Sequence, residues 1–155
     1  MKILLAVDGS ACSDAAVDSV ARRPWPAGSG FLVISVAEPP PLAAMPDTWA
    51  PTMDLYNRMQ AEGLSRATAA VGKAEKRLRG AVGGDMKIKT NVLEGFPKEA
   101  IVQEAERWGA DLIIVGSHGY HGLKRLWLGS VSLAVASQAS CSVEIVRSGQ
   151  ESPRD

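Results

Sequence analysis

The chain has 155 residues, with 17 basic and 17 acidic side chains and a formal net charge of zero at pH 7. That length suits one domain around a single core, and the charge balance gives no overall attraction to nucleic acid or to an anionic membrane. The longest apolar runs, 3–7 and 112–115, are far shorter than the roughly 20 residues of a membrane-spanning helix. We therefore expect one domain over residues 1–147, no binding to nucleic acid or membrane, and a disordered tail over 148–155.

Apolar runs predict five strands, at residues 3–7, 31–36, 86–92, 112–115 and 143–146. The first run is short and stops at the acidic Asp8 without a small-residue cleavage site, so we interpret it as a strand rather than a signal peptide. Three- and four-residue apolar spacing between the strands predicts helices over residues 10–23, 64–82, 97–108 and 129–139. Pro97 suits a first helical turn, and Gly109 suits the position just after a helix end.

Strand and helix signals thus alternate along the whole chain, as βαβαβαβαβ. The strand runs are continuously apolar, which is typical of a sheet covered by helices on both faces. We therefore predict an α/β fold with a doubly wound, five-stranded parallel sheet and right-handed crossovers. Strand order 3-2-1-4-5 would place the carboxyl ends of strands one and four side by side.

Residues 38–51 do not fit this alternation, because they are rich in proline. We expect a loop there. It either connects the second strand to the next helix or serves as a lid or partner surface beside a ligand.

Two cysteines are present, Cys12 and Cys141, and neither has metal-ligand spacing around it. The simplest interpretation is a pair of free thiols in the reducing cytoplasm. Cys12 lies close to a predicted helix N-terminus, where the pKa of a thiol falls, so a redox-sensing role for it is the alternative.

Unusual residues follow two of the predicted strands. Asp8, Gly9 and Ser10 come after the first strand, and the fourth strand runs into a loop with glycines at 116, 119 and 122. In open parallel sheets, ligands bind outside the carboxyl ends of the strands, where the strand order reverses. Both features would open onto that crevice if the two strands are neighbours.

The glycines allow the backbone to turn sharply, to adopt positive φ and to approach a ligand, so the loop could present N–H groups to phosphate oxygens. After Lys124 and Arg125, the residues Gly129-Ser130-Val131-Ser132 open the fourth predicted helix, whose free N–H groups and positive dipole end attract an anion. Ser130 and Ser132 would add hydroxyl donors. A glycine turn or a Gly-Ser cap alone is common, but the two after one strand indicate a polyphosphate site.

The role of Asp8 stays open at this point. A carboxylate repels phosphate, so it could accept a hydrogen bond from ribose or from the adenine amino group, act through a bound cation, or cap the helix near Ser10. His118 and His121 have no carboxylate partner nearby in sequence, which is weak support for acid–base catalysis. The chain also lacks the P-loop, dinucleotide-binding and Gly-x-Ser-x-Gly patterns.

The stretches 3–10, 111–119 and 129–132 together resemble the universal stress protein family. The most specific feature is its nucleotide motif of Gly, two residues, Gly, nine residues, Gly and Ser or Thr, which Gly116, Gly119, Gly129 and Ser130 satisfy. The resemblance implies the ATP-binding branch of the family and an adenine nucleotide alpha hydrolase-like fold. One departure is Cys141-Ser142-Val143, where family members often have Cys-Pro-Val.

What the resemblance implies for the site is an ATP-binding set, with a divalent cation such as Mg²⁺ or Mn²⁺ on the nucleotide. The adenosine end would border Ala6, Val7 and Asp8, with Val36 beside the adenine. Ribose and phosphates would meet Val115, Gly116, His118 and Gly119, and the phosphate chain would lie on Gly129, Ser130, Val131 and Ser132. The family also implies a homodimer that pairs through strand 143–146, an apolar edge.

These observations favour a cytoplasmic, non-enzymatic ATP-binding regulator of stress responses that acts on a downstream protein partner. A slow ATPase or self-phosphorylating enzyme, using His118, Ser130 or Asp8, is the alternative, although the expected base and cationic clamp are missing. A dimeric interaction module with a vestigial site is a third reading.

Overall fold

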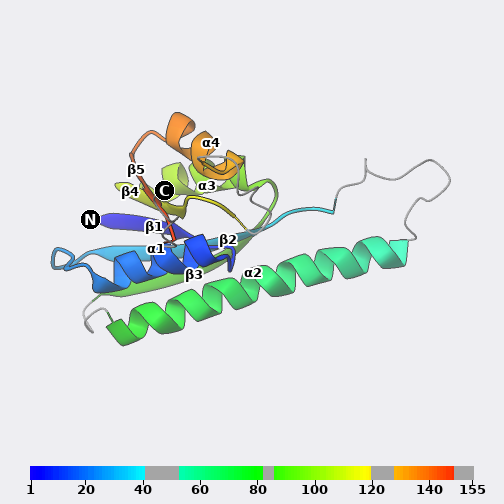
Figure 1. Cartoon of the computed structure of the whole chain (residues 1–155), viewed down its shortest axis with the longest axis horizontal. Helices are drawn as coiled ribbons and strands as arrows, with labels where there is room; N and C mark the ends of the chain where they lie inside the picture. Colours follow the sequence, from blue (N-terminus) through cyan, green and yellow to red (C-terminus); the bar gives the residue numbers. More distant parts are fainter. Residues whose placement is uncertain (41–52, 82–85, 120–127, 149–155) are drawn as a thin grey trace, which may run out of the picture.

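The computed structural model describes residues 1–40, 53–81, 86–119 and 128–148 (Figure 1). Expectations about the proline-rich segment from residue 41 onward, about His121, Gly122, Lys124 and Arg125, and about the tail after Ser148 fall outside these residues. Within them, no helix combines the length and the apolar character needed to cross a bilayer.

The five predicted strands form one parallel sheet in the order β3-β2-β1-β4-β5, so the predicted fold class and strand order are confirmed. Strand β1 lies at the centre, where Leu5 is level with Val33 on one neighbour and Ile114 on the other. The strand order reverses between β1 and β4, which places the carboxyl ends of these two strands side by side. The strand bounds are β1 Lys2–Ala6, β2 Gly30–Ala37, β3 Lys87–Glu94, β4 Leu112–Gly116 and β5 Ser142–Val146.

The described residues form four helices, which cover the sheet from both faces (Figure 1). Their bounds are α1 Ala11–Arg22, α2 Met53–Ala81, α3 Pro97–Trp108 and α4 Ser130–Gln138. Pro97 begins α3, and Gly109 follows it in the left-handed conformation at φ 70°, as the sequence pattern predicts. Helices α1 and α2 lie on one face of the sheet, and α3 and α4 lie on the other.

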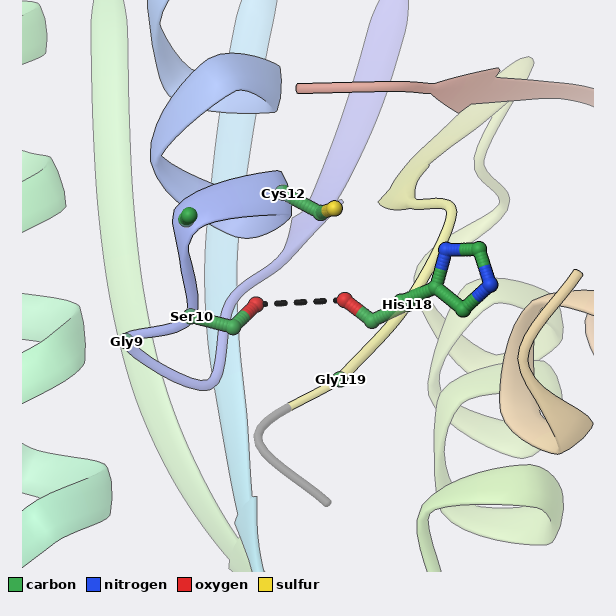
Figure 2. Close-up of a pocket in the computed structure, with 6 residues that line it drawn as sticks. Gly9, Ser10, Cys12, His118 and Gly119 are labelled. Atoms are coloured by element: carbon green, nitrogen blue, oxygen red, sulfur yellow. Dashed lines mark hydrogen bonds between the residues drawn. The ribbon is translucent and has the colours of Figure 1, made fainter. Parts of the chain in front are cut away.

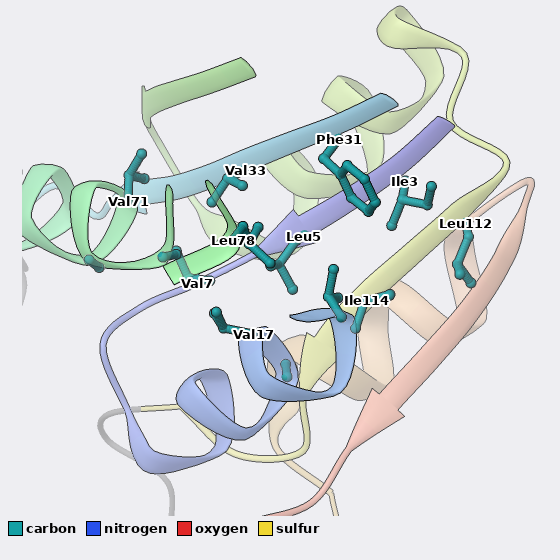
Figure 3. Close-up of a cluster of buried hydrophobic side chains, with 14 residues drawn as sticks. Ile3, Leu5, Val7, Val17, Phe31, Val33, Val71, Leu78, Leu112 and Ile114 are labelled. Carbon is teal, nitrogen blue, oxygen red and sulfur yellow. The ribbon is translucent and has the colours of Figure 1, made fainter. Parts of the chain in front are cut away.

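Alternate residues of the strands pack into two separate hydrophobic cores, one on each face of the sheet. Leu5, Phe31 and Ile114 point toward α1 and α2, whereas Leu4, Ile34 and Ile113 point toward α3 and α4. Figure 3 shows the first of these clusters closed by side chains from both helices, including Val17 and Leu78. Because successive strand residues point to opposite faces, burial on both faces requires the continuous apolar runs seen in the sequence.

Helix α2 begins at Met53, well before the start expected at Leu64. Its N-terminal part projects past the carboxyl edge of the sheet (Figure 1), and its apolar side chains there are exposed, with Met53 at 72% and Leu64 at 41%. A helix segment that covers no core needs no periodic apolar face. The predicted pattern began at Leu64, which is exposed, and the part that packs on the sheet runs from Ala67 to Leu78.

Candidate functional site

A pocket of about 310 Å³ opens at the carboxyl ends of β1 and β4. Its lining comes from the turn after β1 with the first residues of α1, and from the loop after β4; the residues are Gly9, Ser10, Ala11, Cys12, His118 and Gly119. Figure 2 shows these two segments facing each other across the opening. The volume lies at the lower end of the range typical of small-molecule sites, about 300–1,000 Å³.

Ser10 fixes the β1 side of the pocket. As the N-cap of α1, its hydroxyl accepts a hydrogen bond from the N–H of Ser13, and the same hydroxyl donates to the carbonyl of His118 at 3.2 Å (Figure 2). The second bond ties the turn after β1 to the loop after β4. The two sides of the pocket are therefore joined at its base.

Asp8 is exposed and is turned toward the pocket. Its Oδ1 accepts a hydrogen bond from the N–H of Ser10 at 2.9 Å, so it organises the turn while Ser10 provides the helix cap. A Cβ added to Gly119 would lie 2.8 Å from Asp8 Oδ2, which places this carboxylate directly against the loop after β4. The sequence left cap, ribose contact and cation contact open for Asp8, and the structure gives the cap to Ser10.

Gly116 and Gly119 are needed for close approach. The described glycines with positive φ are 9, 28, 95 and 109, so neither of these two uses the left-handed conformation that the glycine pattern suggested. A Cβ on Gly116 would lie 2.7 Å from the carbonyl carbon of Cys12 and 2.8 Å from the nitrogen of Ser13. Gly116 therefore lets β4 pass the first turn of α1, whereas Gly119 lies on the pocket and meets a flexible side chain.

Helix α4 begins at the same edge without a side-chain cap in the part of the chain that is described. Gly129 is its N-cap, with its N–H donating to the carbonyl of Ser117 at 2.7 Å, so the loop after β4 also fixes where α4 starts. Free N–H groups in the first turn, together with the helix dipole, attract an anion. Ser130 is exposed there, while the predicted donor Ser132 is buried and donates its hydroxyl to the carbonyls of Ser117 and Gly129.

The other predicted site residues line the same edge of the sheet. Val7 and Val115 are buried, at 5% and 4% exposure, whereas Ala6, Val36 and Val131 are partly buried against the second core. His118 is half-buried, with Nδ1 3.2 Å from Ser117 Oγ. The twelve predicted residues thus lie at or just after the carboxyl ends of β1, β2 and β4, or at the start of α4.

Cys12 is a pocket residue that the sequence did not assign to the site, as are Ser10 and Ala11. Burial by itself raises the pKa of the Cys12 thiol, but hydrogen bonds with the Ser148 and Ser117 hydroxyls outweigh it and lower the pKa to about 7. Burial raises the pKa of the other thiol, Cys141. The capping signal at Ser10, two residues after Asp8, was the available clue, because it starts α1 at the carboxyl edge.

No group of three or more His, Cys, Asp or Glu side chains is placed to hold a metal ion among the residues described. The site offers backbone N–H groups, hydroxyls, one carboxylate and an imidazole instead. That donor set suits an anion with a sugar attached better than a bare divalent cation.

A family model described as the Universal stress protein family matches residues 1–147. This chain belongs to the universal stress protein family. It is 30% identical to universal stress protein YxiE of Bacillus subtilis over 154 residues, which cover 94% of this chain and 98% of that protein. A shorter match, 47% identical over 62 residues, covers 40% of this chain and 36% of universal stress protein MJ0531 of Methanocaldococcus jannaschii.

Solved structures share the fold of this universal stress protein. Hypothetical protein MJ0577 has a TM-score of 0.80 and 26% identity, with 97% of each chain covered. A family protein from Arabidopsis thaliana, solved with AMP bound, has a TM-score of 0.68 at 15% identity and covers 97% of this chain and 93% of its own. A universal stress protein in complex with cAMP has a TM-score of 0.65 at 24% identity, and the match covers 96% of this chain and 98% of that one.

The two glycines of the loop after β4 should respond differently to alanine. Gly116→Ala places a methyl group against backbone of α1, which cannot move without shifting the helix, so we expect the free energy of unfolding to fall by about 1–3 kcal/mol. Gly119→Ala meets the end of the Asp8 side chain, which can rotate away, so we expect a change within about 0.5 kcal/mol. Urea unfolding of both variants measures these changes. Equal stabilities would contradict the conclusion that Gly116, and not Gly119, is needed for packing against α1.

Proposed function

We propose that this universal stress protein binds an adenine nucleotide, specifically ATP, at the carboxyl edge between β1 and β4. The observation that carries the proposal is the start of α4. This helix has no side-chain cap among the described residues, and it comes after the loop that contributes Gly119 to the pocket. A phosphate chain placed there would receive the first-turn N–H groups of α4, and the exposed Ser130 would add a hydroxyl. The AMP and cAMP complexes support the proposal in so far as proteins of this fold accommodate adenine nucleotides.

The residues of this chain fit such a ligand in shape. Gly9 and Gly119 present backbone on opposite sides of the opening, with no Cβ to narrow it. The Asp8 carboxylate lies beside Gly119, where a ribose hydroxyl could donate to it. When bound, ATP would carry its own divalent cation, and the chain would supply orientation and charge stabilisation.

We propose a binding and regulatory role rather than catalysis. Two of the three candidate catalytic groups already have structural contacts, and the first of these is Asp8, which accepts a hydrogen bond from the Ser10 N–H. His118 contacts Ser117 through Nδ1. Nucleotide occupancy would instead stabilise the arrangement of β1, β4 and α4 and so change what a partner protein meets. Both cysteines are free thiols, which is consistent with the cytoplasmic location that we propose.

ATP binding should raise the thermal midpoint of unfolding and depend on the open space at Gly119. We expect millimolar ATP to stabilise the protein by about 2.7 kcal/mol at one hundred times Kd, and Gly119→Leu to abolish the effect. Gly72→Leu is the matched control, because Gly72 is exposed on α2 and nothing lies within 4 Å of its Cβ position.

Thermal denaturation, together with mass spectrometry of nucleotide released from protein purified without added ligand, measures this. No stabilisation and no released adenine nucleotide would overturn the proposal. Steady release of labelled phosphate from ATP, lost in His118→Ala, would favour the enzymatic alternative.

We also propose that the protein forms a homodimer through β5. Ser117 N–H donates to the carbonyl of Val146, so in the parallel ladder the backbone groups of Val143 and Ile145 point to the free edge. The opposite edge strand, β3, exposes Lys87 and Lys89, which oppose pairing. Pairing of two β5 strands is therefore favoured over pairing of two β3 strands.

Proline at position 143 tests the dimer, because it removes an outward N–H and leaves the ladder to β4 intact. We expect sedimentation to give about twice the chain mass of 16.4 kDa for the unmodified protein and the single-chain mass for Val143→Pro. A Val143→Pro variant that is folded and still dimeric would show that another surface is used.

A further inference from the structure

Helix α2 carries one row of side chains that faces α1. Positions 66, 70, 73 and 77 are spaced by four, three and four residues, which places them on a single helix face. On this row, Arg77 pairs with Asp18 at 2.5 Å and Lys73 pairs with Asp14 at 2.6 Å. Each step of four residues along α2 matches a step of four along α1, so the two helices run in the same direction.

Toward the N-terminus of α2, the row continues past the level at which α1 starts. Ala70 comes next, and its Cβ lies 3.8 Å from the position of a Cβ on Gly9, in the turn before α1. Gly9 is also part of the pocket lining and has φ 81°, a conformation that favours glycine. Gly9, which carries no side chain, therefore lies between α2 and the pocket.

Arg66 occupies the following position of the row, about 6 Å beyond Ala70 along the helix axis. Gly63, three residues before Arg66 on α2, also shows how far along the sheet this part of the helix lies. Its Cβ position is 3.8 Å from the carbonyl oxygen of Glu38, just after β2. Arg66 is thus level with the strand ends and on the side of α2 that faces α1. It is exposed and makes no hydrogen bond or ion pair with any residue in the described ranges.

We infer that Arg66 is a nucleotide-binding residue that contacts a phosphate group at the mouth of this pocket. The inference rests on the proposed nucleotide site. At Lys73 and Arg77, an aspartate of α1 provides the counter-charge. At the level of Arg66, helix α1 has not yet begun, and the ligand would provide the counter-charge. A guanidinium binds phosphate oxygens through two parallel N–H donors, which a planar side chain reaching past a glycine is suited to do.

This assignment also explains how a phosphate is tolerated beside a carboxylate. Asp8 is exposed on the same turn, with Oδ1 on the Ser10 N–H and Oδ2 beside Gly119. A cation on the opposite side of Gly9 would offset the repulsion between this carboxylate and an entering phosphate. The α4 N-terminus and Arg66 would then hold the anion from two directions.

Isothermal titration of ATP into Arg66→Ala, Arg66→Lys and Arg58→Ala tests the inference. Arg58 is the matched control, because it is an exposed arginine two turns further out on the same helix and also has no partner among the described residues. We expect Arg66→Ala to weaken ATP binding about tenfold at about 0.05 M NaCl, and Arg66→Lys to recover part of the loss. Arg58→Ala should stay within about twofold of the unmodified protein, because Arg58 lies about 12 Å farther along the helix axis from the strand ends than Arg66 does.

Raising NaCl to about 0.5 M should shrink the difference between Arg66→Ala and the unmodified protein, because an ionic contact is screened and a packing effect is not. An unchanged Kd for Arg66→Ala, or equal losses for Arg66→Ala and Arg58→Ala, would overturn the role of Arg66 while leaving the nucleotide site standing. Absence of ATP binding by the unmodified protein would overturn both. Thermal unfolding without nucleotide confirms that each variant is folded.

Discussion

Gly116 meets the backbone of α1 at the point where β1 and β4 diverge, with its Cβ position 2.7 Å from the carbonyl carbon of Cys12. This approach brings the turn after β1 and the loop after β4 close enough for Ser10 to donate to the carbonyl of His118. The same loop accepts the N–H of Gly129 at Ser117 and so positions the start of α4. The pocket and the anion-attracting helix end therefore both depend on the absence of a side chain at residue 116.

The two helices that begin at this edge differ in how far the positive charge at their N-termini is already compensated. The first turn of α1 is capped by Ser10, and acidic Asp14 lies in it, so that helix end is already compensated. The first turn of α4 has neither a side-chain cap nor an acidic residue among the described residues. An anion is therefore attracted more strongly to α4 than to α1. In the proposed complex, phosphates would lie toward α4 and the adenosine toward the strand ends.

Much of the fold could be predicted from the sequence, because burial on both faces of the sheet imposes continuous apolar runs and β1 to β5 have them. The early start of α2 could not, since residues 53–63 precede the periodic apolar stretch and the N-terminal part of the helix projects from the sheet. For the site, the Gly116 to Ser132 pattern marked the edge of the sheet at which the pocket opens. It did not reveal that Gly116 serves packing against α1, or that Ser132 donates to backbone carbonyls, because such contacts arise only when distant segments meet.

In the complex that we propose, ATP lies between the carboxyl ends of β1 and β4, against the start of α4. A titration of isotope-labelled protein with ATP and Mg²⁺, followed by amide chemical shifts in NMR spectra, tests it most directly. We expect the largest shifts at Gly9, Ser10, His118, Gly119, Ser130 and Val131. Shifts confined to other regions, such as β3 and the C-terminal half of α2, or no shifts at saturating ATP, would contradict it.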